Sequence, residues 1–283
     1  MITVTDTVFQ LDTRTTSYLV RAEGGLLQQL YYGPKIKVCD TGPLLTKNAA
    51  GYGSEVVYRP DTAPLSLDSL PLDFSPQNKG DFRLSSFIAA QKAGTTADFA
   101  YTGFEILNET PVLDGLPSPH GADGTLALHL ATATGLQVTL FYTVYEQADV
   151  IARTVRVHNG TQDAVRLQRA DSFQLDLPGC AYTLYTLTGA WARERQVTPH
   201  RLAPGAVCFG SRSGVSSSRT NPFFFLKEDG ATEFAGRVYG FNLVYSGSFE
   251  GAAEVSTLGE TRVLAGVQSD GFCWPLAPGQ QFD

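Results

Sequence analysis

Residues 189–197, GAWARERQV, place Trp191 beside Arg193, Glu194 and Arg195 in a chain that is sparing with charge. In a strand, Trp191, Arg193 and Arg195 would project from one face, and Glu194 from the other. Trp191 could then stack its aromatic ring on a sugar, while Arg193 and Arg195 offer guanidinium donors to the hydroxyl groups of the sugar. Alternatively Glu194 pairs with an arginine while Trp191 packs under the arginine stems. Such clusters are commonly structural, and both interpretations stay open.

A second unusual stretch is SSSRTNPFFF, residues 216–225. Small hydroxyl side chains, an arginine and the Asn221-Pro222 pair predict an ordered turn that ends by burying Phe223 and Phe225. The alternative is the polar rim of a pocket.

Other candidates for chemistry are weak. The carboxylate pairs Asp171 with Asp176 and Glu105 with Glu109 have spacings typical of solvated or structural residues. No nucleophile elbow, phosphate loop or metalloprotease motif occurs, so no catalytic residue is assigned within the chain. The histidines and the four cysteines lack metal-ligand spacing, and the cysteines are expected to be free, buried thiols. No metal and no cofactor are expected.

The net charge of −7 argues against a nucleic-acid partner or an anionic membrane surface, because phosphates need clustered Lys and Arg. No apolar run approaches the roughly 20 residues of a membrane span. No signal peptide is visible either, so a cytoplasmic location is expected.

The chain is expected to be all-β. Apolar residues alternate with mostly polar ones over residues 136–144, which is the period of a half-buried strand. Residues 150–172 predict two strands around the turn-rich HNGTQD, with Val155 and Val157 sharing one face and Val165 and Leu167 another. Helices should be few and short. These patterns predict large antiparallel sheets packed face to face in a single domain, residues 1–283, with an irregular arm or loop over residues 40–80.

Several segments, in order, resemble the N-terminal domain of bacterial α-galactosidases of glycoside hydrolase family 36. They are GDFR (80–83), DGLPSPHG (114–121), LQVTLFYTVYEQADVIARTVRVHNG (136–160), LTGAWARERQV (187–197), SRSGVSSSRTNPFF (211–224), RVYGFNLVYSGSF (237–249) and GFCWPLAPGQQF (271–282). The chain departs from the family pattern at Ser218, Ala100 and Phe104, where family members commonly carry histidine, arginine and histidine.

The resemblance implies a β-supersandwich similar to galactose mutarotase folds, followed in the family by a catalytic (β/α)₈ barrel. The family's nucleophile and acid/base aspartates lie in barrel motifs that this chain lacks. The resemblance therefore implies a part excised or truncated from a parent that hydrolyses terminal α-galactosides with retention. Its partners would be the C-terminal barrel, other copies in a homo-oligomer, and a galactoside.

Three hypotheses follow. The chain is a non-catalytic scaffold and interface domain, inactive alone; an independent carbohydrate-binding module; or a mutarotase-like epimerase, which needs a general acid and base flanking the sugar. Under the first two, Trp191, Arg193 and Arg195 face the barrel or the substrate, and Arg83 and Asn221 are weaker candidates for the same role.

Overall fold

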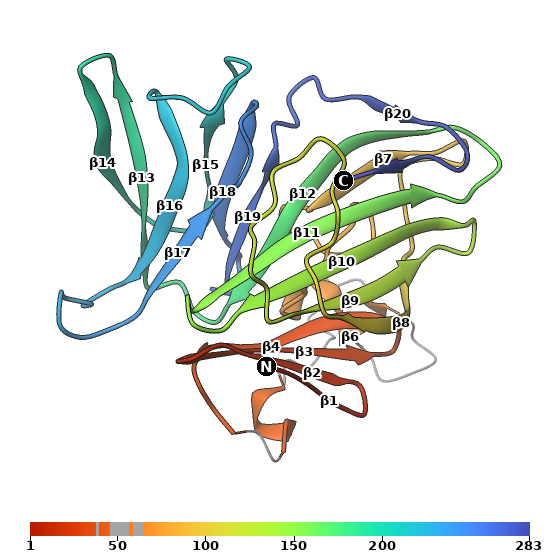
Figure 1. Ribbon diagram of the computed structural model, residues 1–283, viewed down its shortest axis with the longest axis horizontal. Coiled ribbons are helices and arrows are strands. Elements are labelled where there is room, and N and C mark those ends of the chain that lie inside the picture. Colours follow the sequence, from red (N-terminus) through yellow and green to blue (C-terminus); the bar gives the residue numbers. More distant parts are fainter. Residues whose placement is uncertain (38–39, 46–56, 59–64) are drawn as a thin grey trace. The chain divides into compact units, whose positions relative to one another are not determined.

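A computed structural model describes residues 1–37, 40–45, 57–58 and 65–283 (Figure 1). Part of the irregular arm expected over residues 40–80 lies outside the described residues. The chain divides into two compact units, unit 1 (residues 1–168 and 273–283) and unit 2 (residues 169–272). The single domain expected from the sequence stays a prediction.

Unit 1 consists of antiparallel strands that pair mostly with their neighbours along the chain. One sheet has the order β1-β2-β3-β4 and a second has the order β21-β11-β10-β9-β8, while β5 and β6 form a ribbon. The strands are β1 (Ile2–Thr5), β2 (Val8–Asp12), β3 (Thr16–Glu23), β4 (Leu26–Pro34), β5 (Val57–Tyr58), β6 (Leu65–Ser66), β7 (Phe87–Ala90), β8 (Ala100–Leu107), β9 (Gly124–Ala131), β10 (Leu136–Tyr145), β11 (Val150–Asn159), β20 (Trp274–Leu276) and β21 (Gln281–Phe282).

Unit 2 is built in the same way. One sheet has the order β14-β13-β16-β17, and a second contains β15-β18-β19-β12. The long strand β12 runs across the boundary of the units: Val165–Leu167 belong to unit 1 and pair with β20, and the residues from Asp171 onward belong to unit 2 and pair with β19. The strands are β12 (Val165–Leu177), β13 (Tyr182–Ala190), β14 (Arg193–Arg201), β15 (Gly205–Ser211), β16 (Thr220–Glu228), β17 (Val238–Asn242), β18 (Phe249–Val255) and β19 (Thr261–Val267).

The all-β expectation is confirmed, because the only helices among the described residues are the short 3₁₀ turns η1 (Gly42–Leu44) and η2 (Leu67–Ser69). The expected galactose mutarotase-like β-supersandwich of large facing sheets is wrong. The strands of the described residues fall instead into four separate sheets of four to six strands and one ribbon. The strands β11 and β12 show the reason: HNGTQD joins them, yet they belong to different sheets. Alternation identifies the buried face of a strand but does not choose its partner.

The predicted strand faces are confirmed. Val155, Val157, Val165 and Leu167 are buried, and so are the alternating residues of β10: Leu136, Val138, Leu140, Tyr142 and Val144. The buried face of β10 therefore forms part of the core of unit 1.

A buried polar network fixes β3, β10 and β11 around one carboxylate in unit 1. The hydroxyl groups of Tyr18 and Tyr142 both donate to Asp73. Arg153 donates to the Asp73 side chain at 3.2 Å, and its guanidinium lies 4.7 Å from the centroid of the Tyr142 ring. Because each Asp73 oxygen has a donor, the charge is tolerated in the core.

Two further observations concern the whole described chain. No helix among the described residues is long and apolar enough to cross a membrane. Cys180, Cys208 and Cys273 are free but exposed, so the burial expected for these thiols is wrong. Cys39 lies outside the described residues.

Candidate functional site

The hairpin of β13 and β14 in unit 2 carries the residues that the sequence singled out first. Ala190 pairs with Arg193, so Trp191 and Ala192 form the tip of the hairpin. Ala192 has φ 61°, a left-handed conformation that reverses the chain within two residues. The Trp191 side chain is 91% exposed, which is unusual for an indole ring.

Close backbone packing shapes the base of this tip. A Cβ atom on Gly189 would lie 2.4 Å from the Arg193 carbonyl oxygen and 3.1 Å from that of Ser218. The Gly189 amide donates to the Arg219 carbonyl at 3.1 Å. The absence of a side chain at residue 189 therefore lets the 216–220 turn pack against the hairpin.

The expected sharing of one face by Trp191, Arg193 and Arg195 is interrupted. Arg195 has φ 57°, which breaks the alternation of side chains along β14. Glu194 accepts a hydrogen bond from the Ala192 amide at 3.0 Å. Within the described part of the chain, neither Arg193 nor Arg195 forms an ion pair, so the brace between Glu194 and an arginine is not formed.

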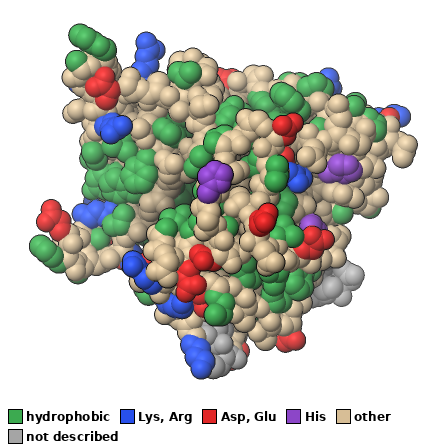
Figure 2. Space-filling model, in the orientation of Figure 1, with side chains coloured by type: hydrophobic (Ala, Val, Ile, Leu, Met, Phe, Trp, Pro, Cys, Tyr) green, Lys and Arg blue, Asp and Glu red, His purple; other side chains and the backbone are tan. Residues whose placement is uncertain are grey.

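The sheet β14-β13-β16-β17 presents an apolar outer face. By strand register the apolar residues of this outer face are Tyr185, Leu187, Val197, Phe223, Phe225 and Val238, and the polar residues Thr183, Arg201, Lys227 and Asn242 lie on the same face. The rings of Tyr185 and Phe225 stack at 4.7 Å between centroids. Val197 and Val238 are each 55% exposed and Phe223 is 38% exposed. Figure 2 shows hydrophobic side chains gathered on the left of the view, over this sheet.

The opposite face of the same sheet is the buried one, and it carries Leu184, Phe224 and Leu226. The prediction that Phe223 and Phe225 are buried is therefore wrong, because Phe224 takes the core position between them. Asn221 fixes the start of β16: its side-chain oxygen accepts a hydrogen bond from the Phe223 amide at 2.9 Å. Asn221 and Pro222 themselves lie in β16, and the turn of this stretch precedes them at Ser218 and Arg219.

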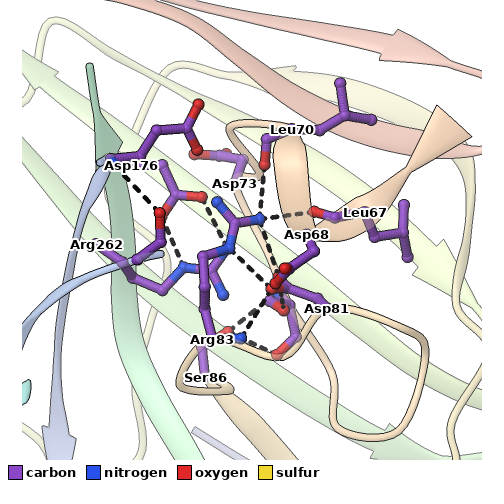
Figure 3. A network of polar contacts seen from close by, with 12 residues as sticks. Leu67, Asp68, Leu70, Asp73, Asp81, Arg83, Ser86, Asp176 and Arg262 are labelled. Atoms are coloured by element: carbon purple, nitrogen blue, oxygen red, sulfur yellow. Dashed lines mark hydrogen bonds and ion pairs between the residues drawn. The ribbon is translucent and has the colours of Figure 1, made fainter. Parts of the chain in front are cut away.

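Arg83 is a buried structural residue of unit 1 (Figure 3). Its guanidinium donates to both oxygens of Asp81 and, at 2.7 Å each, to the carbonyl oxygens of Leu67 and Leu70. Arg83 thus satisfies the backbone of η2, and its donors point to protein groups. The structure brings Trp191, Arg193 and Arg195 into one hairpin with Asn221 on the adjoining strand β16, while Arg83 belongs to unit 1.

Sequence reasoning missed a buried charged cluster in unit 2. Asp171 and Asp176 were expected to have the spacing of surface residues, yet they are 1% and 3% exposed. Asp176 accepts two hydrogen bonds of 2.7 Å from the buried Arg262 (Figure 3). Asp171 accepts one from Arg169, which lies two residues before it and so on the same strand face. This i, i+2 charge pair is the signal that could have revealed the cluster.

Neither unit offers an evident metal centre. Among the described residues no three His, Cys, Asp or Glu side chains are placed to hold a metal ion. An open surface pocket of about 520 Å³ in unit 1 is lined by Asn108, Thr110, Val112, Phe141 and Arg156. Arg156 is already paired there with Asp283, at 2.5 Å and 2.9 Å.

Comparison with known proteins gives a consistent result. The model of the glycosyl hydrolase family 36 N-terminal domain matches residues 25–277. The chain is 34% identical over 285 aligned residues to the α-galactosidase Mel36A of Lactobacillus acidophilus, covering 97% of this chain and 38% of that protein.

Solved structures agree. The α-galactosidase AgaB of Geobacillus stearothermophilus superposes with a TM-score of 0.93 at 32% identity, covering 100% of this chain and 39% of AgaB. A variant of AgaA from the same organism, solved in complex with raffinose, superposes with a TM-score of 0.91 at 33% identity, covering 97% of this chain and 39% of AgaA. The chain thus spans about two fifths of the length of these relatives. The family model, the sequence identity and the superposition of the backbone agree, and the chain belongs to the family of glycosyl hydrolase family 36 N-terminal domains.

Proposed function

We propose that this chain is the non-catalytic N-terminal part of an α-galactosidase and serves as a scaffold and interface for the catalytic part. The relatives are α-galactosidases of which it matches only 38–39%. The observation that carries the proposal is the outer face of sheet β14-β13-β16-β17, where Val197, Phe223 and Val238 are exposed together. Contiguous apolar surface of this kind marks an interaction site.

The carboxylates of unit 2 support a non-catalytic role. A retaining glycosidase needs two carboxyl groups about 5–5.5 Å apart that both reach the sugar. Asp171 and Glu250 are brought together, but Arg169 contacts both of them and Asp171 is buried. They are therefore unsuited to attack an anomeric carbon. The proposal assigns the nucleophile and the acid to the catalytic part.

A hybrid enzyme tests this assignment. This chain would replace the matching N-terminal part of Mel36A, and hydrolysis of a chromogenic α-galactoside would be measured. We expect the hybrid to be active, and we expect Val197→Ser combined with Phe223→Ser to lower its activity at least tenfold by weakening docking. Val112→Ser is the matched control, because Val112 is 86% exposed and is not part of the sheet that carries the outer face. Equal activity of the outer-face variant and the control would contradict the proposed docking surface.

A carbohydrate-binding module is the second candidate. It is favoured by the 91% exposure of Trp191 on the same hairpin as Arg193 and Arg195, which form no ion pair with the described residues. It predicts galactose or raffinose binding by calorimetry, weakened about tenfold in Trp191→Ala because stacking on an aromatic ring is lost. No heat of binding at millimolar sugar would exclude it.

A mutarotase-like activity, a homo-oligomeric state and a cytoplasmic location remain predictions from the sequence. Polarimetry on freshly dissolved galactose would test the first of these.

A further inference from the structure

Three charged side chains of unit 2 meet in the sheet β15-β18-β19-β12, where β18 begins and β19 ends. Gly266 of β19 pairs with Asp171 of β12 on one side and with Glu250 of β18 on the other. A Cβ atom on Gly266 would lie 2.5 Å from the Asp171 Cα and 2.8 Å from its Oδ1 atom. Since Gly266 has no side chain, none stands between the two carboxyl groups.

One guanidinium serves both acids. Arg169 donates through Nε to Asp171 Oδ2 at 2.7 Å, and its Nη2 atom lies 3.0 Å from Glu250 Oε1. Glu250 also accepts a hydrogen bond from the Ser269 hydroxyl at 2.9 Å. Asp171 Oδ1 and Glu250 Oε1 are both buried without a hydrogen-bond partner in the described part of the chain, and of the two only Glu250 Oε1 has the ion pair with Arg169. Two negative charges would therefore share one positive charge in a nearly dry site.

An ionised carboxylate in such a site is unfavourable, whereas a neutral carboxyl group loses far less on burial. We propose that Asp171, Arg169 and Glu250 form a proton-binding site, in which Asp171 takes up a proton in the neutral pH range and thereby makes the stability of unit 2 depend on pH. Burial raises the pKa of Asp171 to about 7; Arg169 opposes this rise and Glu250 adds to it.

The other titratable group close to Arg169 does not compete for this proton. The Cys208 thiol on β15 interacts with Arg169, Glu250 and Glu254. Partial desolvation raises the pKa of the Cys208 thiol above its ordinary value of 9.0; Arg169 lowers this pKa, and both glutamates raise it. The thiol therefore stays neutral while Asp171 titrates.

The sign of the pH dependence follows from linkage. The folded state holds the Asp171 proton up to about pH 7, whereas the unfolded chain releases it near the ordinary value of 3.8. Between these values the folded state binds one more proton. Stability is therefore fully present below about pH 4, falls as the pH rises to 7, and then levels off.

Urea unfolding of the whole chain from pH 5 to 8.5 tests the site. Because other groups also titrate, each variant is compared with the wild type at the same pH. The quantity compared is the folding equilibrium constant of the wild type divided by that of Asp171→Asn. We expect this ratio to fall about tenfold per pH unit between pH 5 and 6.5 and to level off above pH 7.5. Asp270→Asn is the matched control, since Asp270 is an exposed residue of the same unit paired with Arg212; its ratio should stay flat. A flat ratio for Asp171→Asn would overturn the proposal.

Two further measurements keep the proposal testable if Asp171→Asn does not fold. Glu250→Gln removes the neighbouring charge and should move the midpoint of the pH dependence to a lower pH. Isotope-edited infrared spectra of the wild type should show a protonated aspartic acid carbonyl band at pH 6 that is lost at pH 8.5. Absence of that band at pH 6 would contradict the site.

Discussion

At the scale of single residues, glycines decide where two backbones can approach. Gly189 allows the hairpin tip to meet the 216–220 turn, because a Cβ atom there would lie 2.4 Å from one carbonyl oxygen and 2.8 Å from the Glu194 Cα. Both are backbone atoms, so a side chain at residue 189 could be accommodated only if a strand moved. The position of Trp191 therefore depends on this glycine.

Gly189→Ala is expected to lower the free energy of unfolding by about 1–3 kcal/mol, the usual effect of overpacking a close contact. Chemical denaturation of the variant and the wild type measures this difference. Gly103→Ala is the control, since nothing lies within 4 Å of the Cβ position at Gly103. If the two variants were equally stable, the close approach at Gly189 would be unimportant.

Arg83 is expected to act through stability alone. Arg83→Met would remove the guanidinium that pairs with the buried Asp81 and that donates to the carbonyl oxygens of Leu67 and Leu70. We expect a loss of about 3–5 kcal/mol in the free energy of unfolding, measured by urea titration. Sugar or partner binding by the remaining folded fraction should be unchanged. If Arg83→Met weakened binding without lowering the free energy of unfolding, Arg83 would again be a candidate interface residue.

The sequence could predict which residues are unusual, but only partly what they do. The exposed position of Trp191 at the hairpin tip is compatible with contact to a sugar and with contact to the catalytic part. Arg83 resembled a binding residue because η2, whose carbonyl oxygens it satisfies, lies 13–16 residues earlier in the chain. The partner that Glu250 provides to Arg169 lies 81 residues away, which no local spacing reveals.

At the scale of elements, one carboxylate joins two turns of unit 1. Asp149, in the turn between β10 and β11, accepts hydrogen bonds from the Thr13 hydroxyl, the Thr15 amide and the Thr15 hydroxyl. These bonds, led by that from Thr13, lower the pKa of Asp149 to about 2 from its ordinary value of 3.8. The ionised form therefore stabilises the folded state.

This stabilisation should be present above about pH 4 and be lost as the pH falls towards 2. Asp149→Asn should therefore lower the thermal midpoint at pH 6 and have little effect near pH 2, as differential scanning calorimetry can show. Asp6→Asn serves as a control, since Asp6 lies in the turn between β1 and β2 and, like Asp149, has a positive φ, 53°. A decrease that is the same at both pH values would contradict the ionic contribution of Asp149.

The outer face of sheet β14-β13-β16-β17 also belongs to this scale. The buried face of this sheet, which carries Leu184, Phe224 and Leu226, contributes to the core. The side chains of the outer face lie on the other side of the sheet and are not part of that core. Val197→Ser with Phe223→Ser should change the free energy of unfolding of this chain by less than about 1 kcal/mol, because exposed positions contribute little. A larger loss on denaturation would mean that these side chains serve the fold.

At the scale of the whole molecule, the strands themselves could be predicted from the sequence, but the grouping of the strands into sheets could not. The β10 strand was predictable because every second residue from Leu136 to Val144 is apolar, and all of these residues lie in the core. The separation of β11 from β12 was not, since a turn signal says that the chain reverses but not that the next strand joins another sheet. The expected supersandwich was wrong for the same reason, because the sequence does not show which sheet each strand joins.

The account of the whole molecule rests on the absence of catalysis by this chain itself. The most direct test is hydrolysis of a chromogenic α-galactoside by the purified chain, with Mel36A measured under the same conditions. We predict release no faster than in buffer, while the full-length relative turns over. Turnover that follows the folded chain through every purification step would contradict the account.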